Sequence, residues 1–220
     1  GFKLGGLKFG NKTFTLGSAT TDLTLEIESS NSSGSNTGSP PGTLATKTAD
    51  FTVISADAVD ITTGTTITST GGKFSFAEGI TISGAAISLQ DTTLAVGNVL
   101  TNTGGTITLN QANLELISDL NLNSDADLEF IQLKLENNHL DLQTVPSFTV
   151  DQKLVLDNLN EKLTWSDNTE LILSGGVQLN ANGSLGWKKP DNLEIGQITL
   201  NGGSLIIGDT SAQTFDLDSG

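Results

Sequence analysis

The stretch NLELISDLNLNSDADLEFIQLKLENNHLDLQ, residues 113–143, places large apolar residues two positions apart in short groups. Its couplets are Leu114 with Leu116, Leu120 with Leu122, Leu128 with Phe130, Leu133 with Leu135, and Leu140 with Leu142. A period of two puts these side chains on one face of a β-strand, whereas an amphipathic helix needs apolar positions three and four apart. The Asn, Ser and Asp residues between the couplets favour turns, because their side chains compete for backbone hydrogen bonds. The stretch therefore predicts short strands joined by turns.

The same couplet recurs on both sides of this stretch. Examples are Phe51 with Val53, Phe74 with Phe76, Ile80 with Ile82, Phe148 with Val150, Leu171 with Leu173, and Ile198 with Leu200. Between Ile107 and Phe215, couplets begin every 7.2 residues on average. This leaves about four residues for a strand and two or three for a turn, which is shorter than the spacing of about 8–12 residues typical of an immunoglobulin-like sandwich.

A repeat this short predicts an all-β fold, a right-handed parallel β-helix (β-solenoid) with about three short strands per coil. Roughly 22 residues then make one coil, and the inward couplets of successive coils stack as aliphatic ladders. Glycine pairs such as Gly71-Gly72 and Gly104-Gly105 are expected at corners, where the backbone adopts positive φ. Only four prolines occur and none interrupts a couplet, as expected of strands paired on both edges.

The sequence predicts three segments. Residues 43–220 form the β-solenoid. Residues 29–42, SSNSSGSNTGSPPG, contain no large apolar side chain and form a flexible loop. Residues 1–28 form an N-terminal strand segment.

The N-terminal segment differs from the remainder in charge. Its first twelve residues contain Lys3, Lys8 and Lys12 and no acid, so they carry +3, against −18 for the other residues. Two interpretations stay open. The segment is a cap or first coil that covers strand edges, or it is an assembly arm whose lysines dock on the acidic end of a neighbouring molecule and build a filament.

Composition excludes several chemistries. The chain has no Cys, so disulfides, thiolate metal sites and a cysteine nucleophile are impossible. It has ten Lys, no Arg and a net charge of −15, so we expect no nucleic-acid partner. No apolar run approaches the roughly 18 residues of a membrane span. The chain begins at Gly1 without a signal-peptide pattern, and we expect a fragment or a processed product.

Candidate sites are few. His139 is the single histidine, so any catalytic triad would have to include it, and an exposed position on the coil is the simpler interpretation. In NSDADLE, residues 123–129, alternation predicts four oxygen-bearing side chains on one strand face, those of Asn123, Asp125, Asp127 and Glu129. Asp125, Asp127 and Glu129 form a candidate Ca²⁺ site. The run lacks the glycine and the final glutamate of an EF-hand loop. A solvated outer face is the alternative, and no other cofactor is expected.

Two further features bear on ligands. Trp165 and Trp187 stand in couplet positions, which favours inward packing over stacking on sugar rings. The run ITTGTTITST, residues 61–70, suggests the threonine ranks of an ice-binding surface, but no equivalent run recurs at a fixed interval in the sequence. The 25 acids could supply the two carboxylates of a glycosidase, although the lack of Arg disfavours cleavage of acidic polysaccharides.

The stretches NTGGTITLNQANLELISDLNLNSDADLEF and NGGSLIIGDTSAQTFDLDSG resemble the β-helical passenger regions of autotransporters and filamentous-haemagglutinin-like adhesins of bacterial surfaces. The resemblance extends over residues 43–220 and is one of composition and style. It implies a non-enzymatic, extracellular or cell-surface rod used for adhesion, scaffolding or cell-to-cell contact. The main hypothesis is therefore a structural or adhesive β-solenoid whose partner is a second copy, joined end to end in a filament, or another surface protein or a glycan. The alternative is a carbohydrate-active β-helix, such as a polysaccharide lyase or a tailspike-like glycanase.

Overall fold

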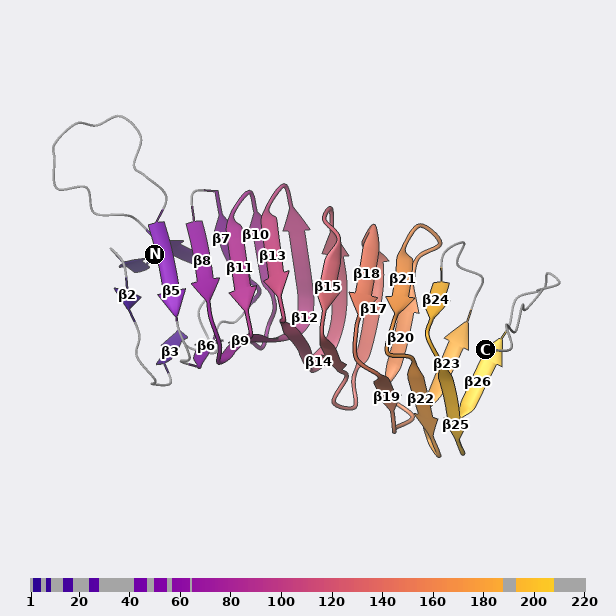
Figure 1. Ribbon diagram of the computed structural model, residues 1–220. Coiled ribbons are helices and arrows are strands. Elements are labelled where there is room, and N and C mark those ends of the chain that lie inside the picture. Colours follow the sequence, from indigo (N-terminus) through magenta and orange to yellow (C-terminus); the bar gives the residue numbers. More distant parts are fainter. Residues whose placement is uncertain are drawn as a thin grey trace, which may run out of the picture.

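The structure is a computed structural model that describes residues 2–4, 7–8, 14–17, 24–27, 42–46, 50–54, 57–63, 65–187 and 193–207. All regular structure in these ranges is β-strand. The strands stack side by side into an elongated coil, with the N-terminal strands at one end and β26 at the other (Figure 1). This is the architecture that the short couplets predict.

The coil has three faces, here named A, B and C. Face A comprises β3 (Phe14–Gly17), β6 (Phe51–Ile54), β9 (Lys73–Phe76), β16 (Gln132–Lys134), β19 (Leu154–Leu156), β22 (Val177–Asn180) and β25 (Ile198–Asn201). Face B comprises β1 (Phe2–Leu4), β4 (Thr24–Ile27), β7 (Val59–Thr62), β10 (Ile80–Ser83), β17 (His139–Thr144), β20 (Lys162–Trp165), β23 (Ser184–Trp187) and β26 (Ser204–Ile207).

Face C completes each turn. It comprises β2 (Leu7–Lys8), β5 (Gly42–Thr46), β8 (Thr65–Ser69), β11 (Ala86–Gln90), β13 (Thr106–Asn110), β15 (Leu128–Phe130), β18 (Ser147–Val150), β21 (Glu170–Leu173) and β24 (Leu193–Ile195). Two longer strands, β12 (Thr93–Thr103) and β14 (Asn113–Ser124), each pass from face A onto face B.

All strand pairs within the faces are parallel, and partners lie one turn apart in the sequence. Ile87 pairs with Ile107 and Leu140 with Leu163, so one turn takes 20 residues in the first case and 23 in the second. The parallel β-solenoid with three strands per turn is therefore confirmed. At three places, strands of successive turns contact each other without a hydrogen-bonded ladder between them. These pairs are β13 with β15, β16 with β19, and β20 with β23.

The length of β12 and β14 differs from the expected four residues, since these strands have 11 and 12 residues. Both continue around the corner between faces A and B, where the pairing register shifts between Val96 and Asn98. Gly97 makes this path possible, because a Cβ atom there would lie 2.5 Å from the Ala77 carbonyl oxygen. The extra residues of β14 form a bulge that turns the strand without a loop.

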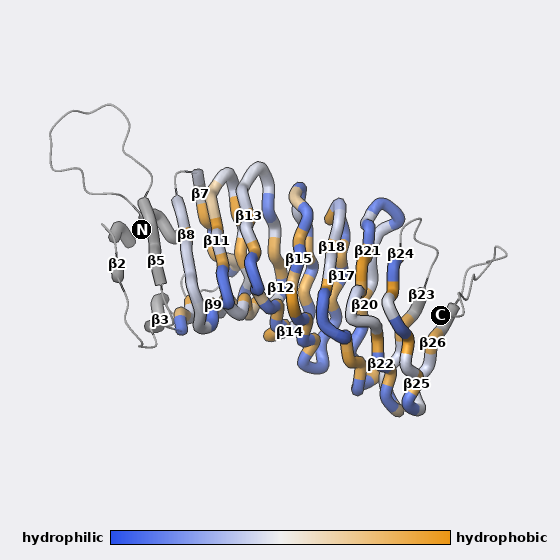
Figure 2. The backbone as a smooth tube through the Cα atoms, viewed as in Figure 1, coloured by the Kyte–Doolittle hydropathy of each residue, from blue (hydrophilic) through white to orange (hydrophobic). Residues whose placement is uncertain are grey.

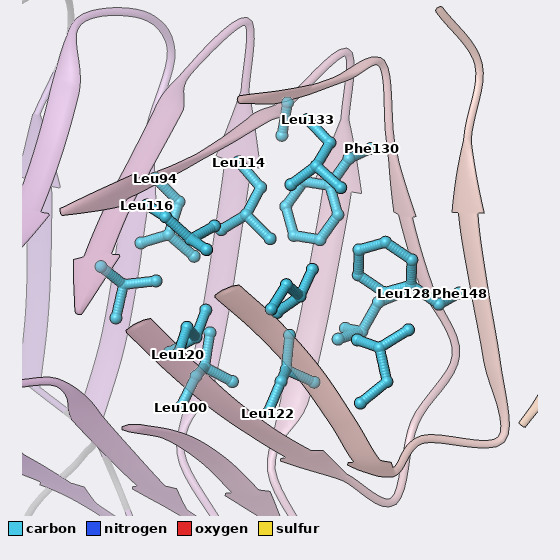
Figure 3. Close-up of a cluster of buried hydrophobic side chains, with 14 of the residues drawn as sticks. Leu94, Leu100, Leu114, Leu116, Leu120, Leu122, Leu128, Phe130, Leu133 and Phe148 are labelled. Atoms are coloured by element: carbon cyan, nitrogen blue, oxygen red, sulfur yellow. The ribbon is translucent and has the colours of Figure 1, made fainter. Parts of the chain in front are cut away.

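The couplets point inward and form one continuous apolar core (Figure 3). Along the backbone, hydrophobic and hydrophilic segments alternate from turn to turn (Figure 2). Phenylalanines mark two points where neighbouring turns meet: Phe51 and Phe74 have ring centroids 5.1 Å apart, and Phe130 and Phe148 have theirs 5.8 Å apart. Burial of each such side chain contributes about 1.5–3 kcal/mol. Because outward neighbours are polar, this burial specifies which face of each strand turns inward.

A few couplets are less buried than expected. Ile198 and Leu200 are 37% and 57% exposed, although they pair with the buried Val177 and Leu179 of the preceding turn. Trp165 packs against the core but is only partly buried. The burial of Trp187 lies outside the described residues.

The backbone of the N-terminal segment continues the same ladders. Strand β1 pairs with β4, β2 with β5 and β3 with β6, all in parallel. Lys3 stands opposite Glu26, and Lys8 opposite Ala45. Lys12 and residues 29–41 of the predicted loop lie outside the described residues.

The two glycines of the corner pair Gly104-Gly105 serve different purposes. Gly104 has φ +63°, the left-handed conformation that the sequence predicts. Gly105 does not share it, but a Cβ atom at that position would lie 2.7 Å from Ile82 Cγ2 and would also strike the Asn102 side chain. One glycine is thus needed for the turn and the other for close packing of successive coils.

Candidate functional site

A groove of about 550 Å³ lies at the corner between faces B and C and extends over four successive turns. It is lined by Asn102 and Thr103, by residues 123–125, by residues 143–146, and by Ser166 and Asn168. In Figure 1 this is the region where β12, β14, β17 and β20 end. The groove therefore runs parallel to the axis of the solenoid, from one turn to the next.

The groove is hollow because the corners differ in length. Three residues, 125–127, connect β14 to β15, and four, 166–169, connect β20 to β21, but only residues 145–146 connect β17 to β18. The short middle corner is set back between two longer ones. Buried Val145 and exposed Pro146 form the apolar part of this corner.

A β-bulge in β17 accounts for the residue by which this corner is shorter than its neighbour in the preceding turn. Leu122 pairs with Leu142, but Asn123 pairs with Thr144, so Gln143 is the additional residue in β17. Both Gln143 and Thr144 are exposed, whereas regular alternation would turn one of them inward. Bulges re-aim side chains in this way and occur often beside binding sites.

Apart from Asp125, the polar side chains of the groove are uncharged and form hydrogen bonds. Thr144 Oγ1 donates to Asn123 Oδ1 at 2.9 Å, and Gln143 Nε2 donates to Asp141 Oδ2 at 3.2 Å. Within the described part of the chain, the Asn123 Nδ2, Gln143 Oε1 and Asn168 side-chain groups have no hydrogen-bond partner. Both donors and acceptors are therefore available to a ligand.

The single carboxylate in the lining is already occupied by the neighbouring turn. Asp125 Oδ2 accepts a hydrogen bond from Gly104 N at 2.5 Å, and Oδ1 accepts one from Asn102 Nδ2 at 2.9 Å. Charge-assisted bonds of this kind are stronger than neutral ones. Asp125 therefore fastens one corner to the next.

The candidate calcium residues do not share one strand. Asn123 is in β14, Asp125 and Asp127 are in the corner, and Glu129 is on the outer side of β15. No group of three or more His, Asp or Glu side chains suited to a metal ion is found among the described residues. Calcium binding at Asp125, Asp127 and Glu129 stays a prediction of the sequence.

Asn102 is the buried polar residue at the base of this corner. It is 2% exposed and stands between Ile82 and Ser124 in the inward stack. Its Nδ2 donates to Asp125, while Oδ1 has no hydrogen-bond partner. An unpaired buried carbonyl costs about 1–3 kcal/mol, so Asn102 is a locally unfavourable residue in this inward stack.

A second groove, of about 430 Å³, lies between β16 and β19 on face A. Its lining includes Lys134, Lys153, Glu136, Asp157 and Glu161. Glu161 is buried and accepts hydrogen bonds from the backbone N–H groups of Asn137, Asp157 and Asn158 and from the Asn158 side chain. Its carboxylate therefore holds the 157–160 loop and is not free to act on a ligand.

His139 lies on the outer side of face B, at the start of β17. Its Nε2 is 2.8 Å from Thr164 Oγ1, and the Thr164 hydroxyl donates to Asp141 Oδ1 at 2.8 Å. Because that proton points to Asp141, His139 Nε2 is the donor in its contact with Thr164. A catalytic triad needs the imidazole between carboxylate and hydroxyl, whereas here the hydroxyl is in the middle.

The outward positions of residues 61–70 stack on equivalent positions of the next two turns, where threonine is absent from the first and returns in the second. Thr66 and Thr68 on β8 stand over Ala86 and Ser88 on β11, which stand over Thr106 and Thr108 on β13. The interval is 20 residues at both steps. This part of face C has small uncharged outward side chains, in a chain with net charge −15.

No motif pointed to the groove at the B–C corner. Apolar couplets on either side of the corners are six residues apart in two successive turns, from Leu122 to Leu128 and from Leu142 to Phe148. Equal spacing hides the difference in corner length, because the bulge at Gln143 takes up one residue. Asn102, Gln143 and Asn168 were therefore not candidates from the sequence.

The stacked parallel ladders define the class of protein: this chain is a parallel β-solenoid. Comparison with known proteins gives no match, since neither a protein-family model, nor a curated protein, nor a solved structure matches it. In the ranges that the structure describes, no helix is long and apolar enough to cross a membrane.

Proposed function

We propose that this chain is a non-enzymatic structural or adhesive element of a bacterial surface, and that its β-solenoids associate end to end outside the cell. The observation that supports this proposal most directly is the solvent exposure of apolar side chains in β25. Ile198 and Leu200 continue the inward ladder of Val177 and Leu179 but are partly solvent-exposed. A further coil stacked on this end would remove apolar surface from water, which stabilises association by about 25 cal/mol per Å².

Backbone geometry supports the same association. Within the described residues, β24, β25 and β26 are each paired on one edge, with β21, β22 and β23. Unpaired strand edges are templates for another chain. At the opposite end, β1 and β2 contain Lys3 and Lys8, which complement the acidic remainder of a second copy.

Charge favours axial over lateral contact. The net charge of −15 makes the long sides of two solenoids repel each other. The ends, where the lysines of one copy meet the acids of another, attract. The expected assembly is therefore a single-file filament.

The experiment is sedimentation velocity and negative-stain electron microscopy of the purified chain over a range of concentrations. Association should increase with concentration, and Leu200→Lys should abolish it, because a charge at the end opposes stacking. Leu159→Lys is the matched control, since Leu159 is an exposed leucine of the 157–160 loop, away from the ends. A wild-type chain that stays monomeric at every concentration, or a Leu200→Lys chain that still forms filaments, overturns the proposal.

The competing function is glycan cleavage. It is favoured by the acidic side chains that line the groove on face A. Glu136 and Asp157 line this groove together with Glu161. Reducing-end assays on a panel of polysaccharides should show no release of sugar. Release that is lost in Glu136→Gln, with folding retained by circular dichroism, would replace the structural proposal by an enzymatic one.

A further inference from the structure

We propose that the groove at the B–C corner binds a neutral oligosaccharide, with the sugar chain lying along the solenoid axis. This inference rests on the proposed adhesive role and names the chemistry of the partner. The groove extends over four turns, which at about 4.8 Å per turn makes a trough roughly 14 Å long. An elongated ligand fits this shape better than a compact one.

The lining matches the two kinds of surface on a pyranose ring. The exposed Pro146 provides an apolar base for the C–H face of a sugar, and the buried Val145 lies beneath it. Asn123, Gln143 and Asn168 surround that base with amide groups that donate and accept hydrogen bonds. Sugar hydroxyls also donate and accept, so amides with free donors and acceptors are suitable partners.

Charge disfavours an anionic ligand. Asp125 is the one ionisable residue of the lining, and both of its carboxylate oxygens are taken by Gly104 and Asn102. The lining therefore offers no cation to an acidic sugar. An anionic polysaccharide would be repelled by the net charge of −15.

The groove is also held in place by hydrogen bonds between turns. Asp125 fastens the corner of β14 to that of β12, and Thr144 bonds to Asn123 across the bulge. Ser166 and Thr169 share a hydrogen bond of 2.9 Å within the next corner. A pre-formed site loses little conformational entropy when it binds a ligand.

The test uses the intact chain and a panel of hexasaccharides built from glucose, mannose or galactose, with hyaluronan and heparin hexasaccharides as charged members. Binding is measured by isothermal titration calorimetry. We expect at least one neutral hexasaccharide to bind, and Gln143→Ala and Asn168→Ala to weaken it about tenfold each, since one lost hydrogen bond of about 1.4 kcal/mol has that effect.

Matched controls separate the groove from the remaining surface. Gln90→Ala and Asn110→Ala remove exposed amides from face C, away from the groove, and should leave affinity unchanged. Absence of binding to every neutral hexasaccharide, binding to charged members alone, or equal loss in the control variants would overturn the inference. Sedimentation of the same samples tests end-to-end association independently, so failure of sugar binding leaves the structural proposal standing, and loss of association leaves sugar binding measurable.

Discussion

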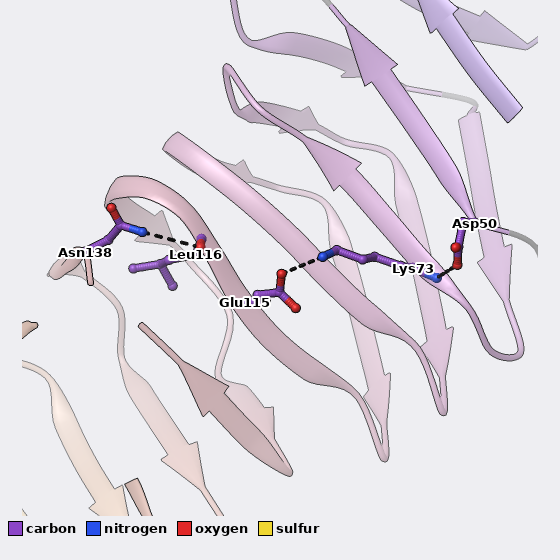
Figure 4. Close-up of polar contacts among 5 residues, drawn as sticks. All are labelled: Asp50, Lys73, Glu115, Leu116 and Asn138. Carbon is purple, nitrogen blue, oxygen red and sulfur yellow. Dashed lines mark hydrogen bonds and ion pairs between the residues drawn. The ribbon is translucent and has the colours of Figure 1, made fainter. Parts of the chain in front are cut away.

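Lys73 on β9 and Glu115 on β14 form an ion pair across the strand that lies between them, with Nζ and Oε1 2.5 Å apart (Figure 4). The two residues are 42 positions apart in the sequence. Between them, Ala95 on β12 points outward yet is fully buried. The backbone N–H of Lys73 also donates to Asp50 Oδ1 in the preceding turn at 2.9 Å. Polar side chains on the outside thus connect turns that the inner ladders already stack.

We expect this ion pair to contribute little to stability. Both side chains are partly exposed, and pairs of this kind are worth about 0.2–1 kcal/mol. A double-mutant cycle with Lys73→Ala and Glu115→Ala, measured by urea denaturation, should give a coupling free energy in that range at about 0.01 M salt and near zero at about 1 M. Glu129→Ala, which removes an exposed acid, should show no coupling to Lys73→Ala. A coupling free energy that does not change with salt would contradict this prediction.

Removal of a core ring should destabilise the chain strongly. Phe148 is fully buried and packs on Phe130, so Phe148→Ala should lower the free energy of unfolding by about 3–5 kcal/mol. In hydrogen exchange, protection should fall most in β15, β18 and β21, because each turn of a solenoid contacts mainly its neighbours. Ile117→Ala is the control and should change stability by less than about 0.5 kcal/mol, since Ile117 is 42% exposed. Equal loss in the two variants would show that the inward ladder is assigned wrongly.

Two glycines should respond differently to alanine. At Gly183 a Cβ atom would lie 2.6 Å from the Leu156 carbonyl carbon, so Gly183→Ala must displace the backbone of an adjacent turn. At Gly104 a Cβ atom would meet nothing within 4 Å, and only the positive φ opposes it, at about 1–2 kcal/mol. Gly183→Ala should therefore lower the thermal midpoint more than Gly104→Ala. The reverse order would mean that the turns are less closely stacked at that corner than the structure shows.

Asp125 should matter more than its acidic neighbours. Asp125→Ala leaves Gly104 N without its acceptor and removes a partner of Asn102, which should cost about 1–3 kcal/mol. Asp127→Ala and Glu129→Ala, both at exposed positions, should have little effect. Thermal midpoints with calcium and with a chelator distinguish this role from metal binding. If calcium raised the midpoint of the wild type but not of Asp127→Ala, the calcium site predicted from the sequence would be supported instead.

The inner half of this fold could be predicted from the sequence. Couplets such as Leu120 with Leu122 are apolar at alternate positions, and only one side of a strand can then turn inward. Spacings near seven residues excluded a sandwich, and the stacked parallel coil followed. Ile198 and Leu200 were predicted to be inward and are, but burial also needs a neighbouring turn, which the couplet does not encode. Alternation after Leu122 predicted that Asn123 and Glu129 lie on one strand with the two aspartates between them. In the structure, the corner between β14 and β15 separates Asn123 from Glu129.

What the sequence by itself determined is the path of the apolar side chains, because burial of Leu, Ile, Val and Phe outweighs any local preference of the chain between them. What the tertiary structure alone decided is which polar residues stand together on the outside. Water solvates an outward Asn or Gln equally well at any register, so their neighbours depend on corner lengths and on bulges such as the one at Gln143. The ion pair of Lys73 with Glu115 and the groove beside Pro146 both arise in this way.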